Sequence, residues 1–262
     1  MAYSAIPTRT STDTNASADI NQLQDNIQGA AMDGVYSNAI INGEMRIAQR
    51  GTSFAAAANA DYTLDRWRYG KNGEAVQTIS QSTEVPSSDI FDYSLRMNTT
   101  TEDETISADN FVNISQRIEG NNFWPYLGKT FKLSFWVRSS VSGNYCLALT
   151  NNAQDRSYVT VYNISEINTW QKVTLTIPHN ATGTWETGTA SGVQIWWTLA
   201  AGSTYQTTAD TWAAGFYLST SLQQNAVFTA GNDFYLTGVK LSLNDIDTTP
   251  RSYEKELELC LR

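Results

Sequence analysis

The chain has 262 residues, a length that suits one β-sandwich with a terminal extension. Hydrophobic residues make up 41% and charged residues only 16%, and Thr, Ser, Asn and Gln dominate the polar remainder, a balance that favours strands over helices. The net charge of -9 disfavours nucleic acid as a partner, and no stretch is apolar for long enough to insert into a membrane.

The N-terminal part has the pattern of an arm followed by a helix. Residues 1 to about 15 are rich in Thr, Ser, Asp and Asn and lack a secretory signal, so we expect synthesis in a cytoplasm and an arm that orders only against a partner. The next segment carries a heptad-like apolar stripe, which is too short to form a stable helix alone. Residues 1–38 are therefore predicted to hold an arm and a helix for oligomerisation or attachment. The stripe is either buried between sister chains, as in a trimeric coiled coil, or packed on the sandwich of its own chain. It consists of Ile20, Leu23, Ile27 and Ala30.

From residue 39 onward the apolar period becomes two, which is typical of half-buried strands. In KTFKLSFWVRS, the residues Phe131, Leu133, Phe135 and Val137 share one face, and QKVTLTIP, GVQIWWTLA and DFYLTGVKLSL alternate in the same way. In the last segment the parity changes across Gly238, which predicts a β-bulge. Shorter candidates are YSLRMNT, FVNISQRI, NYCLALTN and SYVTVYNI. Roughly eight to ten strands predict an all-β fold, an antiparallel β-sandwich over residues 39–262.

A second short helix is predicted at the end of the chain, in YEKELELCLR. There Leu257 and Leu261 are four residues apart and should share one face. Cys146 and Cys260 have no metal-like spacing, so two reduced thiols are expected.

Several motifs occur in the same order as in a known family. IINGEMRIAQRGTSF and DYTLDRWRYG come first, followed by SQRIEG, GKTFKLSFWVRS, NTWQKVTLTI, and finally FYLTGVKL with TPRSYEKELELC. Together they resemble a family of phage tail-fibre and related virion proteins, with coverage from about residue 40 to the end. The resemblance implies a jelly-roll sandwich like those of carbohydrate-binding modules, displayed on a virion and usually trimeric.

Two departures from the family pattern bear on where a receptor site would lie. Residues 45–48 replace an aromatic residue common before the QRG element, and the chain stops soon after ELELC. A receptor site is therefore expected on the sandwich itself, if the protein has one.

The opening motif contains a polar cluster. The guanidinium groups of Arg50 and Arg66 can pair with Asp65 or cap carbonyls where strands cross, and Gly51 can adopt backbone angles closed to other residues. We favour a structural role over a ligand site for this cluster, which comprises Gln49, Arg50, Gly51, Asp65, Arg66 and Trp67.

Recognisable catalytic chemistry is missing from the sequence. The single histidine, His179, has no neighbouring nucleophile motif, and no cofactor or metal signature occurs. Carboxylates for glycoside hydrolysis exist, but none has a catalytic context, and the acidic run at residues 102–104 is read as a solvated loop or, less often, a calcium site. They are Glu102, Asp103, Glu104, Asp155, Glu166 and Glu186. We therefore expect no enzyme activity.

Aromatic residues in loops, together with Trp196 on the outward face of its strand, are the stronger functional signal. Sugar rings pack their C–H faces on aromatic planes, and the same rings could instead seal contacts between chains. The candidates for glycan binding are Trp124, Tyr126, Trp185, Trp196, Tyr205 and Trp212.

The leading functional hypothesis is a tail-fibre-like appendage, homotrimeric, that is held to other virion proteins by its arm and binds host surface polysaccharide or lipopolysaccharide. The alternatives are a purely structural head fibre, collar or decoration protein and, third, a polysaccharide depolymerase.

Overall fold

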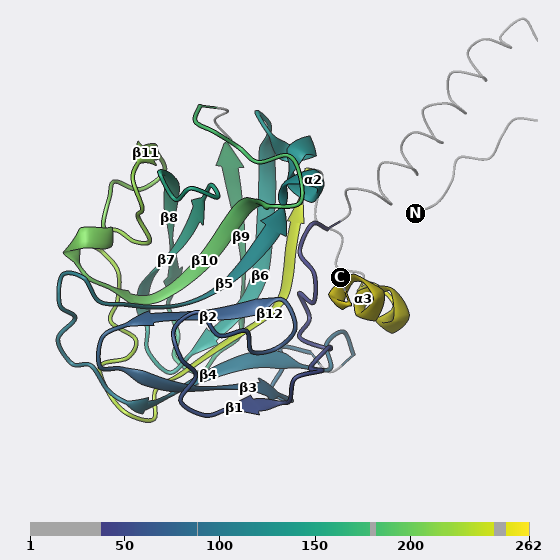
Figure 1. The fold of residues 1–262 in the computed structure, drawn as a ribbon. Coiled ribbons are helices and arrows are strands. Elements are labelled where there is room, and N and C mark those ends of the chain that lie inside the picture. Colours follow the sequence, from purple (N-terminus) through teal and green to yellow (C-terminus); the bar gives the residue numbers. More distant parts are fainter. Residues whose placement is uncertain (1–37, 88, 179–181, 244–249, 262) are drawn as a thin grey trace, which may run out of the picture.

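The computed structural model describes residues 38–87, 89–178, 182–243 and 250–261. Within them two six-stranded antiparallel sheets pack face to face as a sandwich (Figure 1). One sheet has the strand order β1-β3-β4-β12-β6-β9 and the other β11-β8-β7-β10-β5-β2. The first sheet contains β1 (Ser53–Phe54), β3 (Val76–Ser82), β4 (Ser94–Thr101), β12 (Asp233–Ser242), β6 (Thr130–Ser139) and β9 (Gln171–Pro178). The second contains β11 (Trp212–Ala214), β8 (Arg156–Ile164), β7 (Gly143–Thr150), β10 (Ser191–Ala201), β5 (Phe111–Glu119) and β2 (Trp67–Asn72). The described helices are α2 (Gly120–Phe123), η1 (Trp124–Tyr126), η2 (Ser203–Tyr205) and α3 (Tyr253–Cys260).

The alternating strands carry the core, as predicted. All eight segments named from the sequence are strands. The inward-facing residues of β6 are fully buried: Phe131, Leu133, Phe135 and Val137. At the centre, the ring of Trp197 on β10 lies 5.3 Å from that of Trp67 on β2 and 5.8 Å from that of Phe135. Tilted and edge-on aromatic pairs of this kind stabilise a core beyond the area they bury. The predicted antiparallel sandwich of jelly-roll type is confirmed.

The predicted bulge in β12 is also confirmed. The pairing of β12 with β6 shifts between Thr237 and Lys240, and Gly238 adopts a φ of 60°. A Cβ at this position would lie 2.9 Å from the Phe91 ring and 3.0 Å from Trp136. Glycine is therefore required both by the left-handed backbone and by the close approach of two rings.

Four strands lack the alternation by which the other eight were found. The strands β1 and β11 are two and three residues long, and β2 is interrupted by Gly70. In β3 the fully buried inward residue Gln77 is polar, and it accepts a hydrogen bond from the Tyr69 hydroxyl. A polar residue facing the core removes the apolar period on which strand prediction depends.

The opening motif forms a turn built on the buried side chain of Asn42. Its Nδ2 donates to the carbonyls of Ile47 (2.8 Å) and Asp65 (2.9 Å), and its Oδ1 accepts from the Ile47 amide (2.9 Å). The Asn42 carbonyl accepts from Nε1 of Trp67 (2.9 Å), and the backbone φ of 55° is one that asparagine tolerates. Asn42 thus ties residues 42–47 to the start of β2.

The predicted structural role of the QRG and DRW residues is supported by their contacts. Asp65 is buried, and its carboxylate accepts from the backbone amide of Gln49 (2.7 Å) and from Gln49 Nε2 (2.9 Å). Nη1 of Arg50 lies 3.9 Å from Oδ1 of Asp65. Arg66, with φ of 72°, pairs instead with Glu119 at 3.3 Å, so only Arg50 pairs with Asp65. Gly51 has φ of 128°, which requires glycine.

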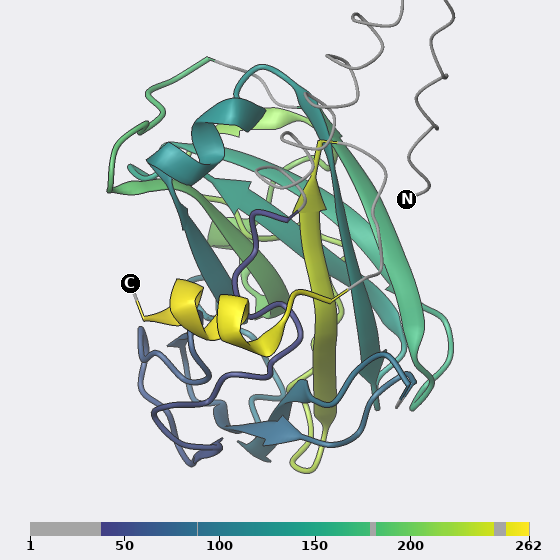
Figure 2. The same cartoon turned by 90° about the vertical axis from the view of Figure 1, so that its right-hand side faces the viewer.

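The helix α3 closes the sandwich against this opening segment, beside β12 (Figure 2). Cys260 packs on Ile41 and Ile47, with Leu257 and Leu259 at the edge of the cluster. The predicted helix is confirmed, and the Leu261 amide donates to the Leu257 carbonyl one turn earlier (3.1 Å), but Leu261 is 68% exposed. The buried face instead carries Glu256 and Cys260, which are four residues apart.

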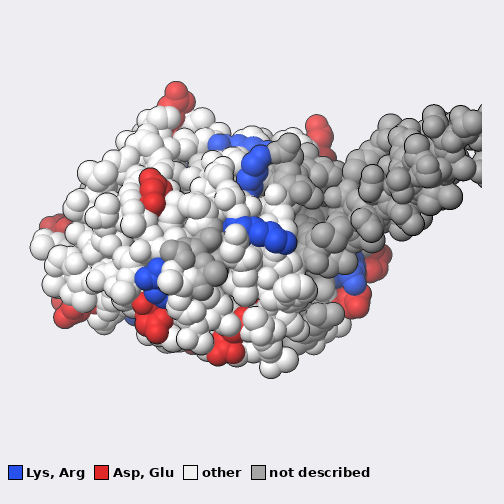
Figure 3. Space-filling model, turned by 90° about the horizontal axis from the view of Figure 1, so that it is seen from above, with Lys and Arg blue, Asp and Glu red and all other residues white. Residues whose placement is uncertain are grey.

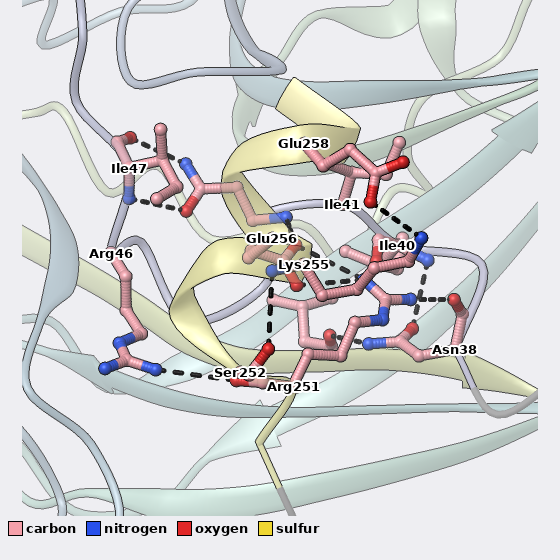
Figure 4. A network of polar contacts seen from close by, with 12 residues as sticks. Asn38, Ile40, Ile41, Arg46, Ile47, Arg251, Ser252, Lys255, Glu256 and Glu258 are labelled. Atoms are coloured by element: carbon pink, nitrogen blue, oxygen red, sulfur yellow. Dashed lines mark hydrogen bonds and ion pairs between the residues drawn. The ribbon is translucent and has the colours of Figure 1, made fainter. Parts of the chain in front are cut away.

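Figure 4 shows the polar part of this closure. Nη1 of Arg251 donates to the Ile40 carbonyl (2.8 Å) and to the Glu256 carboxylate (3.0 Å), and its Nη2 donates to the Asn38 carbonyl. Glu256 also accepts from the Asn42 amide. The ion pair lies within the last described segment, and its hydrogen bonds to the backbone of residues 38–42 join that segment to the first one.

A second carboxyl group, Glu44, lies close to this closure. Burial raises the pKa of Glu44 to about 7; the charge of Glu256 adds to the shift, while Lys240, Arg46 and Arg251 oppose it. Because the folded-state pKa lies above the unfolded value, the fold favours the neutral acid. The contribution of neutral Glu44 to the stability of the fold is therefore complete below about pH 4.5 and is lost as the pH rises to about 7.

We therefore expect Glu44→Gln to be more stable than the wild type at pH 8, by about 1 to 2 kcal/mol. This is less than the full shift would give, because Glu44 is partly exposed. Urea denaturation at pH 4.5, 6 and 8 should show a flatter pH profile for the variant. Parallel profiles for the two proteins would contradict this account of Glu44.

Uncharged side chains dominate the surface at one end of the sandwich (Figure 3). The predicted arm and heptad stripe, with Ile20, Leu23, Ile27 and Ala30, lie outside the described residues, as does His179. No helix within the described ranges is long and apolar enough to cross a membrane.

Candidate functional site

The six aromatic residues predicted to bind glycans do not form one surface. Two of them belong to the packed interior: Tyr126 is 1% exposed, with its hydroxyl donating to the Leu241 carbonyl, and Trp196 is 3% exposed, with Nε1 donating to Thr150. Trp196 points away from the main core, but Leu218 and Phe216 of the following loop cover it. Neither ring can present a face to a sugar, so the prediction fails for these two.

The other four aromatic residues are at least partly accessible. Trp185 and Trp212 meet edge to face with ring centroids 5.4 Å apart, and Trp212 also contacts Tyr158 at 5.4 Å. Tyr205 packs edge-on against Phe111 and Phe216, while Trp124 is 56% exposed. Trp185 and Trp212 therefore pack mainly against other rings, which leaves Trp124 as the most open of the four.

A groove of about 440 Å³ lies elsewhere, where the opening motif, α3 and the edge of the second sheet meet. This volume falls within the range of about 300–1,000 Å³ that is typical of small-ligand sites. Three arginines line it, with one aromatic ring, two carboxylates and several hydroxyl or amide groups. The lining residues are Arg50, Tyr62, Asp65, Arg66, Arg117, Glu119, Asn152, Thr189, Ala190, Ser191 and Cys260.

Strand register brings the charged residues of the groove together. β2 pairs with β5 so that Arg68 lies opposite Ser115, and Arg66 directly precedes β2. On β5, Arg117 and Glu119 are two residues apart and share the outer face. Glu119 pairs with Ser191 at the start of β10, which brings the β9–β10 loop to the rim. Arg117, Glu119 and Ser191 are thus held by neighbouring strands, while the turns beside these strands and α3 supply the other lining residues.

Arg117 is the least satisfied charge in the groove. Its buried Nε has no hydrogen-bond partner, and no carboxylate of the described residues lies within ion-pair distance of its guanidinium. Arg68 lies beside it, and burial, followed by the positive charge of Arg117, lowers the pKa of Arg68. Two guanidinium groups close together without a carboxylate between them create a local positive potential in a chain of net charge -9.

The aromatic surface of the groove is Tyr62, which is 44% exposed. The guanidinium carbon of Arg50 lies 5.7 Å from the centroid of its ring, a cation–π contact. An aromatic plane beside hydroxyl, amide and guanidinium donors is the combination that holds a sugar, with its C–H face on the ring and its hydroxyls on the polar groups.

The groove thiol is not a reactive one. Burial raises the pKa of Cys260 to about 12, so the nucleophilic thiolate is scarce at neutral pH. Cys146 is likewise buried, and both thiols are free, as predicted.

The acidic residues considered from the sequence do not gather in one place. Asp103 is buried and accepts from Nδ2 of Asn110 at 3.2 Å, so the acidic run is anchored at its centre and is not wholly a solvated loop. Asp155 accepts from Asn151, while Glu102, Glu104, Glu166 and Glu186 are not part of the groove. Across the described ranges no group of three acidic, histidine or cysteine side chains could hold a metal ion.

Sequence reasoning missed the groove because its members lie far apart in the chain. Arg66 belongs to the opening motif and was given a structural role, while Tyr62, Arg117 and Glu119 lie in motifs that were noticed but were not singled out. The one available signal was that DYTLDRW and SQRIEG each place an arginine within two residues of an acidic residue in an otherwise weakly charged chain.

Comparisons with known proteins give similarities of fold only. No family model and no curated protein matches the chain. Among solved structures, the enzymatically active domain of bacteriophage CBA120 tailspike protein 4 aligns at 14% identity with a TM-score of 0.41, over 72% of this chain but only 21% of the tailspike. A carbohydrate-binding module, CBM4, aligns at 15% identity and TM-score 0.42, over 77% and 97% of the two chains. The family 11 carbohydrate-binding module of a cellulosomal cellulase of Clostridium thermocellum aligns at 12% identity and TM-score 0.39, over 71% of this chain and 96% of the module. At these identities no ligand or activity can be transferred to this chain.

Proposed function

We propose that this protein is a non-enzymatic appendage of a bacteriophage virion that binds host surface polysaccharide or lipopolysaccharide through the groove defined above. The observation that carries the proposal is that one groove brings together the exposed ring of Tyr62, the unsatisfied guanidinium group of Arg117, and hydroxyl and amide groups. The hydroxyl and amide groups belong to Thr189, Ser191 and Asn152. This composition suits a ligand that has both apolar faces and many hydroxyls.

The virion role is supported by the ordered motifs that resemble phage tail-fibre proteins. In the structure the first and last of these motifs lie side by side, joined by the contacts of Asn42, Arg251 and Glu256. We further propose that residues 1–38 attach the protein to other virion proteins and assemble it as a homotrimer, with residues 39–262 as the sandwich.

A binding role rather than hydrolysis is supported by the state of the groove carboxylates. Asp65 already accepts from Gln49 and is close to Arg50, and Glu119 pairs with Arg66. Both carboxylates thus hold the walls of the groove. Mass spectrometry of host polysaccharide after incubation should show unchanged chain lengths, and shortened chains would support the depolymerase alternative.

Tyr62→Ala is expected to weaken binding of host polysaccharide about fivefold, because an aromatic face contributes about 1 kcal/mol to such a contact. Tyr253→Ala is the matched control, since Tyr253 is 48% exposed and lies under Arg46 at the same 5.7 Å. Isothermal titration calorimetry with purified capsule or lipopolysaccharide measures both. Equal affinity for the two variants would contradict the assignment of the groove.

Phage particles lacking this protein separate the receptor role from the purely structural one. We expect normal particle yield and stability together with reduced adsorption to susceptible cells. Normal adsorption with poor assembly would instead support the head-fibre, collar or decoration alternative.

A further inference from the structure

We infer that the groove selects a carboxylated saccharide, such as a uronate-containing polymer, and that Arg117 binds its carboxylate. This inference rests on the proposed function and adds to it the chemical class of the ligand. It starts from Arg117, which lines the groove, whose Nε is buried without an acceptor, and whose guanidinium forms no ion pair with any of the described carboxylates. A buried donor without a partner has a free-energy cost, which a ligand acceptor would remove.

The positions of the neighbouring charges favour an anion at this point. Arg66 has one carboxylate partner, Glu119, and Arg50 lies 3.9 Å from Asp65, so each groove carboxylate already has an arginine. Arg117 is the third arginine of the lining and has no carboxylate partner in the part of the chain that the structure describes. The lining therefore carries one uncompensated positive charge, three arginines against two carboxylates.

A single uncompensated charge favours a carboxylate over a phosphate monoester. A monoanion neutralises the groove, whereas a phosphate monoester carries nearly two negative charges at neutral pH and would be repelled by Asp65 and Glu119. A guanidinium can also hold both oxygens of a planar carboxylate through two parallel N–H donors.

The remaining lining fits the rest of a sugar residue. Ser191 and Thr189 at the start of β10, with Asn152 of the β7–β8 turn, supply hydroxyl and amide groups for sugar hydroxyls. The Tyr62 ring supplies an apolar plane. A carboxylate alone would not need these groups, which is why the inferred ligand is a saccharide and not a simple organic acid.

The test uses the full chain and four immobilised acidic polymers: polygalacturonate, alginate, hyaluronate and polysialate. Each is compared with a carboxyl-reduced form of the same polymer. We expect at least one acidic polymer to bind, its reduced form to bind at least tenfold more weakly, and Arg117→Gln to lose at least tenfold in affinity for the acidic form only. The matched control is Arg156→Gln, which removes the same charge from β8, outside the groove, where Nε of Arg156 is also buried and unsatisfied.

The outcomes separate this inference from the proposed function. If acidic and reduced polymers bind equally, or Arg117→Gln binds as the wild type does, the carboxylate assignment is wrong while glycan binding stands. If only a phosphorylated polymer such as phosphomannan binds, the groove is a phosphate site and the inference is overturned. If no polymer binds and host lipopolysaccharide and capsule also fail to bind, both are wrong.

Discussion

Replacing Asn42 with alanine is expected to lower the free energy of unfolding by about 3 to 4 kcal/mol. The substitution removes three side-chain hydrogen bonds and leaves the Ile47 amide and the carbonyls of Ile47 and Asp65 without these partners in a buried site. It also places alanine at a φ of 55°, and this backbone strain accounts for part of the expected loss in stability. Denaturation in guanidinium chloride at neutral pH measures the change.

Asn42→Gly is the control that separates the two contributions. Glycine loses the same three hydrogen bonds but adopts the left-handed backbone without strain. It should therefore be more stable than Asn42→Ala by about 0.5 to 1 kcal/mol, yet far less stable than the wild type. A loss below about 1 kcal/mol for Asn42→Ala would show that the opening turn is not a structural centre of the fold.

Glu256→Ala is expected to cost about 3 kcal/mol, because it leaves the Arg251 guanidinium without its carboxylate in a largely buried position. The amide of Asn42 also loses an acceptor. The contact between α3 and the opening segment should weaken, so amide hydrogen exchange should accelerate in residues 253–260 more than in the central strands.

Glu258→Ala provides the comparison on the same helix. Glu258 is exposed and its ion pair with Lys255 is at the surface, so the loss should stay below about 0.5 kcal/mol. The double variant Arg251→Met with Glu256→Leu should recover part of the stability lost in Glu256→Ala, since no unpaired charge remains. If Glu256→Ala and Glu258→Ala lower the free energy of unfolding equally, the buried ion pair does not stabilise the packing of α3.

Half-buried strands were predictable because apolar and polar residues alternate along them. The Phe131 to Val137 series shows this in β6, and the parity change at Gly238 located the bulge of β12. The polar strand β3 escaped prediction because Gln77 meets its partner Tyr69 from another strand, and no local pattern records that pairing.

The site was less predictable than the fold for a related reason. Tyr126 in a loop and Trp196 on the outward face of its strand were taken as accessible, but both are buried, and Trp196 is covered by a segment distant in sequence. Conversely, Tyr62 and Arg117 come from different elements and meet only once β2, β5 and β10 are paired. Composition indicated a surface suited to sugars, while the position of the groove depends on long-range register.

Nuclear magnetic resonance of the arginine side chains tests the central claim most directly. Labelled protein is titrated with fragments of the carboxylated polymer that binds most tightly, and the Nε–Hε signals are followed. We expect the signals of Arg117 and Arg66 to shift and saturate together, while those of Arg138 and Arg156, outside the groove, stay in place. Saturable binding that leaves Arg117 and Arg66 unchanged would place the ligand elsewhere and contradict this account of the groove.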